Sequence, residues 1–312
     1  MKTHTNNTDP TPTFIGLGRM GSNMARRLAR AGLSVHGFDP SPEARQALSG
    51  ETGVTLHADL GSSVSALAGR RLVWLMLPAG AITEQTLSAL ESLLQPGDVL
   101  VDGGNANYLD SQARALRWKA RGVDFVDCGV SGGVWGLAEG YCLMAGGEKQ
   151  AIDALMPLFR ALAPAPDRGW LHCGPSGAGH FTKMVHNGIE YGMMQAYAEG
   201  FALMAGRPEL TPDLGSVAEL WRHGSVVRSW LLDLTTTALQ DPSAMDAVAP
   251  VVADSGEGRW TVDESIRQGT PVPVIAAALM ARFSSQGKAD TGNKLLSLMR
   301  QSFGGHATVS KG

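Results

Sequence analysis

Short apolar runs alternate with longer amphipathic stretches through the first half of the chain. An apolar run of about 4 to 8 residues is typical of a buried strand, and apolar residues three and four apart are typical of a covering helix. The expected strands are residues 13–15, 35–38, 72–77, 99–102 and 123–127. The expected helices are residues 23–30, 42–48, 83–93 and 111–121. This alternation predicts a parallel, doubly wound α/β sheet of the Rossmann-like class.

The pattern changes near Gly174, beyond which turn clusters thin out and long helical stretches follow. A long helix is expected over residues 180–204, after a glycine-rich hinge, and Pro208 and Pro212 break the pattern beyond it. A length of 312 residues also favours two domains, since a single core stops growing at roughly 250–300 residues. The expected parts are a disordered tail at 1–12, an α/β domain at 13–176 and an all-α domain at 177–312.

A glycine motif of the form G-x-G-x-x-G stands between the first expected strand and the first expected helix. Gly16 is placed to make the tight turn, Gly18 to admit a pyrophosphate, and Gly21 to let helix and strand pack closely. The N-terminus of that helix offers free N–H groups and a positive dipole end to phosphates. The predicted dinucleotide-binding turn consists of Gly16, Leu17, Gly18, Arg19, Met20 and Gly21.

Asp39, after the second expected strand, is the candidate for binding the adenosine ribose. An acidic residue about 20 positions beyond the motif accepts hydrogen bonds from the ribose hydroxyls and repels a 2′-phosphate, which favours NAD. Arg45 nearby keeps NADP possible, and a simple turn before Pro40 is the alternative interpretation of Asp39. A small-residue loop at the carboxyl edge of the sheet is a second candidate contact, with a plain turn as its alternative. Its residues are Leu77, Pro78 and Ala79.

Four polar residues of the long helix, Lys183, His186, Asn187 and Glu190, recur at i, i+3, i+4 and i+7. At about 100° per residue they share one face. A solvated polar stripe is the structural alternative, but a Lys and a Glu seven apart gain little as an ion pair. In a partly buried cleft, the pKa of a lysine falls and that of a glutamic acid rises, as a base and an acid require. The pattern therefore predicts an acid–base site.

Three further segments complete a family resemblance. The segment GAGHFTKMVHNGIEYGMMQAYAEGF is accompanied by S-G-G-V-W-G at 131–136, G-R-W-T at 258–261 and F-G-G-H at 303–306. Together they resemble 6-phosphogluconate dehydrogenase in its shorter form, over nearly all of the chain beyond the tail. The related 3-hydroxyisobutyrate dehydrogenases share the glycine motif and S-G-G. Their corresponding helix reads K-x-x-N-N, whereas Lys183 is followed here by His186 and Asn187.

The resemblance implies that Lys183 removes the proton of the C3 hydroxyl while hydride passes to the nicotinamide. The 3-keto acid then loses carbon dioxide, and Glu190 protonates the enediol at C1 to give ribulose 5-phosphate. No metal is needed, because a β-keto acid decarboxylates readily. Asn105 is implied to contact both substrate and nicotinamide. The other implied substrate contacts are Ser131, Gly132, Gly133, His186 and Asn187.

The resemblance also implies a phosphate site, for which the planar donor fork of arginine is suited. Arg259 stands where the longer family members carry a lysine, and this chain lacks much of their helical domain. In those members an Arg and a His six positions later reach across from a partner subunit, so a homo-oligomer, dimer or tetramer, is expected. The candidates are Tyr191, Arg259, Arg282, Arg300 and His306.

Composition sets limits without changing this picture. A formal net charge of -3 gives no electrostatic reason to expect nucleic acid as partner. Cys128, Cys142 and Cys173 form no C-x-x-C pair, which fits a reducing compartment. No stretch reaches about 18 uninterrupted apolar residues, so no membrane span and a cytoplasmic location are expected. Two alternatives remain: a related β-hydroxyacid dehydrogenase for a small unphosphorylated acid, without decarboxylation, and a dinucleotide-binding regulator without catalysis.

Overall fold

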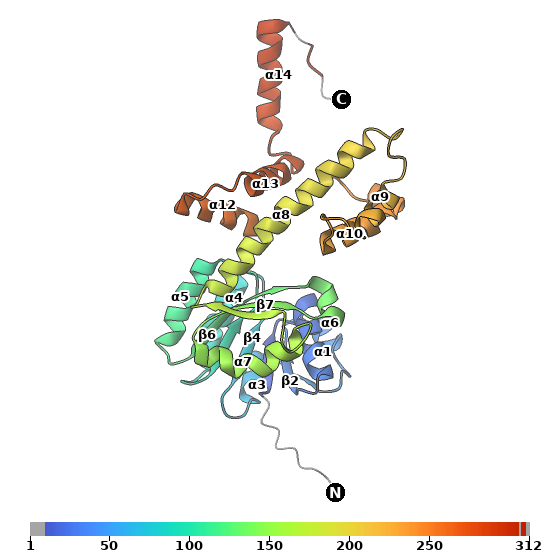
Figure 1. Cartoon of the computed structure of the whole chain (residues 1–312). Coiled ribbons are helices and arrows are strands. Elements are labelled where there is room, and N and C mark those ends of the chain that lie inside the picture. Colours follow the sequence, from blue (N-terminus) through green and yellow to red (C-terminus); the bar gives the residue numbers. More distant parts are fainter. Residues whose placement is uncertain (1–9, 306, 310–312) are drawn as a thin grey trace. The chain divides into compact units, whose positions relative to one another are not determined.

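The computed structural model describes residues 10–305 and 307–309. Within them the chain forms two compact units that divide between Met184 and Val185. Unit 1 is an eight-stranded sheet with helices on both faces, and unit 2 consists of helices (Figure 1). The fold class, a Rossmann-like doubly wound domain followed by an all-α domain, is confirmed. The predicted boundary at 176–177 stays a prediction, and the predicted tail lies mostly outside the described residues.

The sheet of unit 1 has the strand order β3-β2-β1-β4-β5-β6-β7-β8. β7 runs antiparallel to β6, and the other neighbouring pairs are parallel. The order reverses at β1, and ligands of open α/β sheets bind beyond the carboxyl ends of the strands at such a point. The strands are β1 (Pro12–Ile15), β2 (Val35–Phe38), β3 (Val54–Leu56), β4 (Leu72–Leu75), β5 (Val99–Asp102), β6 (Asp124–Ser131), β7 (Cys142–Gly146) and β8 (Trp170–Gly174).

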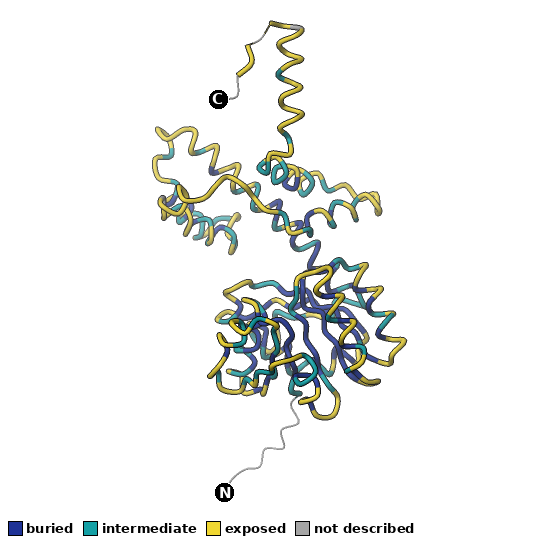
Figure 2. The backbone as a smooth tube through the Cα atoms, turned by 180° about the vertical axis from the view of Figure 1, so that it is seen from behind, coloured by how far each residue is buried: buried dark blue, intermediate teal, exposed yellow. Residues whose placement is uncertain are grey.

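Helices cover both faces of this sheet because successive strand residues point to opposite sides. Phe14 belongs to a core cluster that includes residues of α1 and α7, and Ile15 to one that includes residues of α4 and α5. Figure 2 shows the strands as a buried layer inside unit 1. The helices are α1 (Arg19–Arg30), α2 (Pro42–Gln46), α3 (Leu60–Ser65), α4 (Ala81–Leu90), α5 (Tyr108–Lys119), the 3-10 helix η1 (Gly133–Trp135), α6 (Gly136–Glu139) and α7 (Lys149–Leu162).

Several elements of unit 1 are not predicted by the sequence pattern: β3, β7, β8, α3 and α7. β3 has three residues, too few to show a period. Four of the five residues of β7 are buried, and periodicity alone does not distinguish such a short apolar run from a segment of a buried helix. α7 carries Pro157 in its interior, where proline usually marks a helix end. β6 extends to Ser131, beyond the predicted end at 127, whereas β4 ends at Leu75.

Unit 2 is built along α8, which covers the predicted helix at 180–204 and begins in unit 1. Its first half packs Tyr191 against Ala278 and Leu279, and its second half places Phe201 in a cluster with Ala218 and Leu232. Two small clusters therefore replace one large core. The helices are α8 (Ala178–Ala205), α9 (Leu214–Trp221), α10 (Trp230–Leu239), α11 (Pro242–Asp246), α12 (Glu257–Gln268), α13 (Pro273–Ser285) and α14 (Asp290–Gly304).

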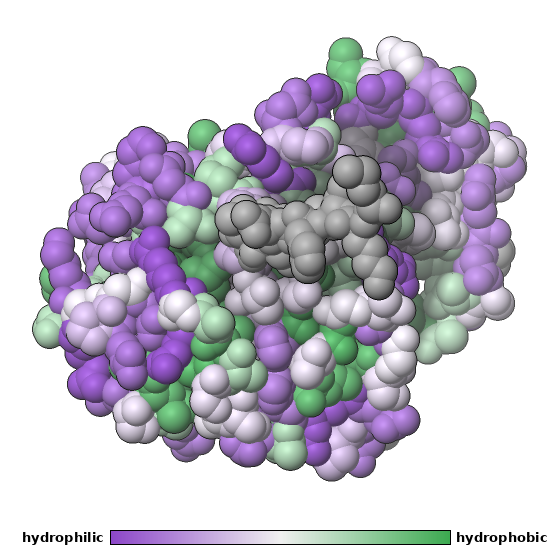
Figure 3. Space-filling model, turned by 90° about the horizontal axis from the view of Figure 1, so that it is seen from below, coloured by the Kyte–Doolittle hydropathy of each residue, from purple (hydrophilic) through white to green (hydrophobic). Residues whose placement is uncertain are grey.

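Hydrophilic residues cover most of the face shown in Figure 3. Hydrophobic residues occur there in separate, smaller areas. Among the described residues, no helix combines the length and the apolarity that crossing a bilayer requires.

A histidine pair joins β2 to the segment after β3. His36 Nδ1 lies 2.7 Å from His57 Nε2, and the rings stack with centroids 4.9 Å apart. Burial, and then the charge of His57, lower the pKa of His36. The folded state therefore binds this proton less readily than the unfolded chain, so the pair's contribution to stability is complete above the unfolded pKa of about 6.5 and is lost as the pH falls through the folded pKa.

We expect the free energy of unfolding to fall on acidification from pH 7 to pH 5, and to fall less in His36→Asn, which removes the titrating ring. Urea unfolding at both pH values measures this difference. An equal fall in the two proteins would show that the protonation of His36 does not contribute to stability in this range.

Candidate active site

The glycine motif forms the turn between β1 and α1. Gly16 has a φ of 93°, which glycine adopts without strain. A Cβ on Gly21 would lie 2.0 Å from the Gly16 carbonyl oxygen, whereas one on Gly18 would meet nothing within 4 Å. α1 then begins at Arg19 with no side-chain cap and no acidic residue in its first turn. The open backbone at Gly18 and the uncapped helix N-terminus fit a phosphate group.

The other members of this turn play different parts. The Leu17 side chain is buried in the core, and Met20 packs partly buried against the same cluster. The Leu17 N–H donates to Asp39 Oδ2 at 2.7 Å, and the Ser41 N–H donates to Asp39 Oδ1 at 2.8 Å. Asp39 is thus a turn residue that also fixes the glycine motif, and its predicted contact with a ribose stays a prediction. Arg45 donates from Nη1 to the Asp39 carbonyl oxygen at 2.5 Å.

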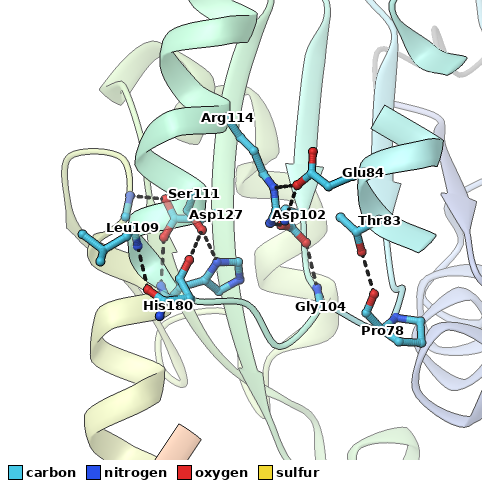
Figure 4. A network of polar contacts seen from close by, with 12 residues as sticks. Pro78, Thr83, Glu84, Asp102, Gly104, Leu109, Ser111, Arg114, Asp127 and His180 are labelled. Atoms are coloured by element: carbon cyan, nitrogen blue, oxygen red, sulfur yellow. Dashed lines mark hydrogen bonds and ion pairs between the residues drawn. The ribbon is translucent and has the colours of Figure 1, made fainter. Parts of the chain in front are cut away.

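Two loops beyond β4 and β5 are fixed to each other. A Cβ on Gly104 would lie 2.4 Å from the Leu77 carbonyl oxygen, so the loop before Asn105 packs directly on the loop with Pro78 and Ala79. The Gly104 N–H donates to Asp102, and the other oxygen of that carboxylate accepts from Arg114 at 2.8 Å (Figure 4). This buried pair holds the loop, and Asn105 is exposed beside it.

Lys183 packs on β6 close to the S-G-G turn. A Cβ on Gly129 would lie 2.3 Å from Lys183 Cβ, so only glycine lets the helix approach the strand so closely. Lys183 is buried, with 8% of its surface exposed. Ser131 follows two positions along β6, and Gly132 and Gly133 then turn with φ of 130° and 52°. The structure thus brings the predicted base and the predicted carboxylate-binding turn to one strand of unit 1.

The remaining stripe residues continue along α8. Because α8 is unbroken from 178 to 205, Lys183 and Glu190 point within about 20° of each other and lie about 10 Å apart along the axis. His186 Nδ1 lies 3.0 Å from Asn187 Oδ1 and 3.9 Å from Glu190 Oε2. Asn187 is buried, whereas the Glu190 side chain is 37% exposed.

Three of the predicted phosphate contacts come together in unit 2. The Arg282 guanidinium lies 3.6 Å from the Tyr191 ring centroid and donates to the Ala253 carbonyl oxygen at 2.7 Å. Arg259 forms a short ion pair with Asp254 and lies over the Phe283 ring. Burial opposes the ionisation of Asp254, but hydrogen bonds from Arg259 and the Gly256 N–H outweigh it and lower its pKa. A phosphate at Arg259 would compete with this carboxylate.

Of the last two predicted phosphate contacts, the structure describes one. Arg300 is exposed on α14, and His306 lies outside the described residues. Two acidic residues that contact or adjoin predicted site residues, Asp127 near the start of α8 and Asp254 at Arg259, are not predicted from the sequence. The only available signals were their positions before S-G-G and G-R-W-T.

Two family models match successive parts of the chain. Residues 12–174 match a family model described as the NAD binding domain of 6-phosphogluconate dehydrogenase. Residues 179–307 match the model of the 6-phosphogluconate dehydrogenase C-terminal domain. A relative from Haloferax volcanii, named 6-phosphogluconate dehydrogenase, NAD(+)-dependent, decarboxylating, is 43% identical over 95% of this chain and 98% of its own length.

Longer relatives match over part of their length. A Bacillus subtilis protein of the same name is 33% identical over 88% of this chain and 61% of its own. The solved structure of Plasmodium falciparum 6-phosphogluconate dehydrogenase, studied with NADP+ and with 6-phosphogluconate, superposes with a TM-score of 0.82 at 27% identity. The superposition covers 96% of this chain and 66% of the Plasmodium chain.

The glycine turn at the switch point of the sheet, together with the buried Lys183 near the start of α8, defines a nicotinamide-dinucleotide oxidoreductase with an NAD-binding domain. Both family models and the extent of the identities place the chain within that class. The chain belongs to the 6-phosphogluconate dehydrogenase family. The predicted family resemblance is thereby confirmed.

Proposed function

We propose that this chain oxidises and decarboxylates 6-phosphogluconate to ribulose 5-phosphate and carbon dioxide, with NAD as the preferred hydride acceptor. The observation that carries the proposal is the position of Lys183, buried against Gly129 of β6 and on the same face of α8 as Glu190. The names of the Haloferax and Bacillus relatives support the reaction and the cofactor.

In this proposal the side chains of α8 perform the proton transfers. Lys183 accepts the proton of the C3 hydroxyl, because a buried amine is more readily neutral than one in water. The nicotinamide dinucleotide, when bound, would supply the acceptor for the C3 hydride. As the 3-keto acid loses carbon dioxide, Lys183 returns its proton to the C3 oxygen, which gives an enediol. Glu190, two turns along the helix, then delivers a proton to C1 while Lys183 takes the enol proton back. Both groups work from one rigid element, which fixes their spacing.

The other candidate residues orient the substrate. Ser131 and the Gly132 and Gly133 N–H groups bind its carboxylate end, and Asn105, His186 and Asn187 bind its hydroxyls. Tyr191, Arg259 and Arg282 bind the phosphate, supported by the two arginines acting on Asp254 and by the Arg282 guanidinium lying over the Tyr191 ring. Arg300 and His306 complete the phosphate site from a partner subunit.

The purified chain, incubated with NAD and 6-phosphogluconate, tests the reaction. We expect NADH and carbon dioxide in equal amounts. NADH without equimolar carbon dioxide would favour a β-hydroxyacid dehydrogenase that does not decarboxylate. Formation of neither NADH from NAD nor NADPH from NADP would favour a regulator without catalysis.

Cofactor preference is expected to depend on Asp39. In Asp39→Ala, the ratio of kcat/KM with NAD to kcat/KM with NADP should fall about tenfold or more, because a charged hydrogen bond to the ribose contributes about 1.5–3 kcal/mol. The substitution also releases the Leu17 N–H, which weakens both cofactors, so the ratio and not either value alone is the measurement. An unchanged ratio would leave Asp39 with its turn role only.

We also propose that the chain works as a homo-oligomer in the cytoplasm. Its three cysteines are free thiols, as is usual in a reducing compartment. Exposed apolar side chains lie within an arc of about 160° on α14, and patches of this kind mark association surfaces. These are Leu295, Leu296, Leu298 and Met299, each between 44% and 56% exposed.

The double variant Leu295→Asp with Met299→Asp is expected to give a monomer in light scattering after gel filtration, because each charge would be buried without a partner at the subunit contact. Gln301→Asp, on the opposite side of α14, is the matched control and should keep the oligomer. An oligomer in the double variant would place the subunit contact elsewhere.

A further inference from the structure

We propose that Asp127 is a positioning residue for the oxidation step: with Ser111 and His180 it forms a buried clamp that sets Lys183 against β6. This inference rests on the proposed function for the role of Lys183. The three clamp residues all belong to unit 1, and none of them touches the substrate in the proposed site.

The first tie of the clamp joins β6 to the start of α8. The Gly177 N–H donates to Asp127 Oδ1 at 2.6 Å, and the His180 N–H donates to Asp127 Oδ2 at 2.8 Å. The first turn of α8 contains no acidic residue, and the first N–H groups of a helix have no partners within it. A carboxylate from a neighbouring strand therefore supplies the capping acceptor that α8 lacks.

The second tie joins α5 to the same helical turn. Ser111 Oγ lies 2.6 Å from His180 Nδ1, and both residues are buried (Figure 4). α5 begins at Tyr108, three residues after Asn105. The clamp thus connects α8 to the segment that follows the Asn105 loop, as well as to the strand that leads to Ser131.

The third observation is how close the elements come at the clamp. A Cβ on Gly179 would lie 2.5 Å from the Asp127 carbonyl oxygen, and one on Gly146 would lie 2.7 Å from Asp127 Oδ1. Lys183, one turn beyond Gly179, meets Gly129 two residues beyond Asp127. A fixed clamp at this point determines where the lysine amine starts relative to the Ser131–Gly133 turn, and displacements of about 1 Å can change turnover strongly.

Burial raises the pKa of Asp127, because the charge of His180 and the two N–H donors only partly offset it. A raised folded pKa means that the folded state prefers the protonated acid, so the contribution to stability is lost as the pH rises through that pKa. The chain thus retains an acidic residue at a buried position where its ionisation costs stability. A geometric requirement explains its retention better than a need for stability.

The experiment compares Asp127→Asn, which keeps the shape but has one acceptor oxygen, with Val126→Ala. Val126 is a buried neighbour on β6 that joins the core cluster of the opposite face, so its truncation weakens the core without touching the clamp. In Asp127→Asn we expect kcat with 6-phosphogluconate to fall about ten- to hundredfold. The affinity for NAD should stay within about twofold of the wild type. The acid limb of the kcat–pH profile should move. Val126→Ala should keep kcat within about twofold even where its melting temperature is lower.

Two readouts do not depend on turnover. The His180 amide should exchange with solvent faster in Asp127→Asn, and an amine-reactive reagent should label Lys183 severalfold faster, as located by mass spectrometry. Ser111→Ala removes only the contact between Ser111 and His180. It should raise the exchange rate of the His180 amide and the labelling rate of Lys183 by smaller factors. If Asp127→Asn does not fold, Ser111→Ala takes its place in these measurements.

The outcomes separate this inference from the proposed function. Unchanged exchange and labelling, or a kcat within twofold of the wild type in Asp127→Asn, would overturn the clamp. Absence of turnover in the wild-type chain would overturn the proposed reaction, while exchange and labelling would still decide whether Asp127 positions Lys183.

Discussion

Replacing Lys183 with alanine is expected to lower kcat for 6-phosphogluconate by about 10²–10⁴-fold, the usual contribution of a positioned general base. The affinity for NAD should stay within a few-fold. The lysine packs on Gly129 of β6, whereas the candidate pyrophosphate contacts lie at the turn between β1 and α1. Steady-state kinetics and titration with NAD in the absence of substrate measure the two effects separately.

Lys183→Arg distinguishes a base from a simple positive charge. Arginine keeps the charge but is not deprotonated at any ordinary pH, so this variant should be nearly as inactive as the alanine variant. Lys149→Ala, an exposed lysine paired with Asp153 on α7, is the control for general effects of removing a lysine. Substantial turnover in Lys183→Arg, or a loss of NAD affinity that matches the loss of turnover, would contradict the assigned role.

The parts of the fold that the sequence predicts are those with local signals. The expected strands of the first half follow short apolar runs, and the expected helices follow apolar spacings of three and four. Gly16, Gly18 and Gly21 stand where the chain must turn and pack closely. β7 and α7 escape prediction because their local signals are ambiguous or misleading. A short apolar run such as that of β7 also occurs in buried helices, and α7 contains Pro157. Their placement depends on β6 and on the core cluster they share, which no local window reports.

The candidate site residues also fall into those with a local sequence signal and those without one. The spacing of Lys183 and Glu190 predicts a shared helix face, and the unbroken α8 provides it. Asp127 has no comparable signal, because its partners lie 50 and 53 residues away along the chain. Asp254 likewise becomes a candidate site residue only through its contacts with the arginines around it. Polar residues that act on neighbours distant in sequence become visible only when the fold brings them together.

The second and third glycines of the dinucleotide motif, Gly18 and Gly21, should show different effects when each is replaced by alanine. A Cβ on Gly21 would lie 2.0 Å from the Gly16 carbonyl oxygen and 3.1 Å from Met76 Cβ. Because backbone cannot swing aside as a flexible side chain does, Gly21→Ala should lower the free energy of unfolding by about 1–3 kcal/mol or more, as overpacking does. It should also weaken NAD binding at least about tenfold, since the Gly16 turn must shift.

Gly18→Ala is the matched substitution in the same motif. Its φ of -62° suits alanine, and its Cβ would meet no protein atom within 4 Å. Its free energy of unfolding without cofactor should therefore stay within about 0.5 kcal/mol of the wild type, as for an ordinary surface change. The new methyl group nevertheless occupies the approach of the pyrophosphate, so NAD affinity should fall at least about tenfold. Urea unfolding of the cofactor-free proteins and calorimetric titration with NAD give both quantities. Wild-type affinity in Gly18→Ala would mean that the dinucleotide does not lie against this turn, because no other property of the variant could compensate for a blocked approach.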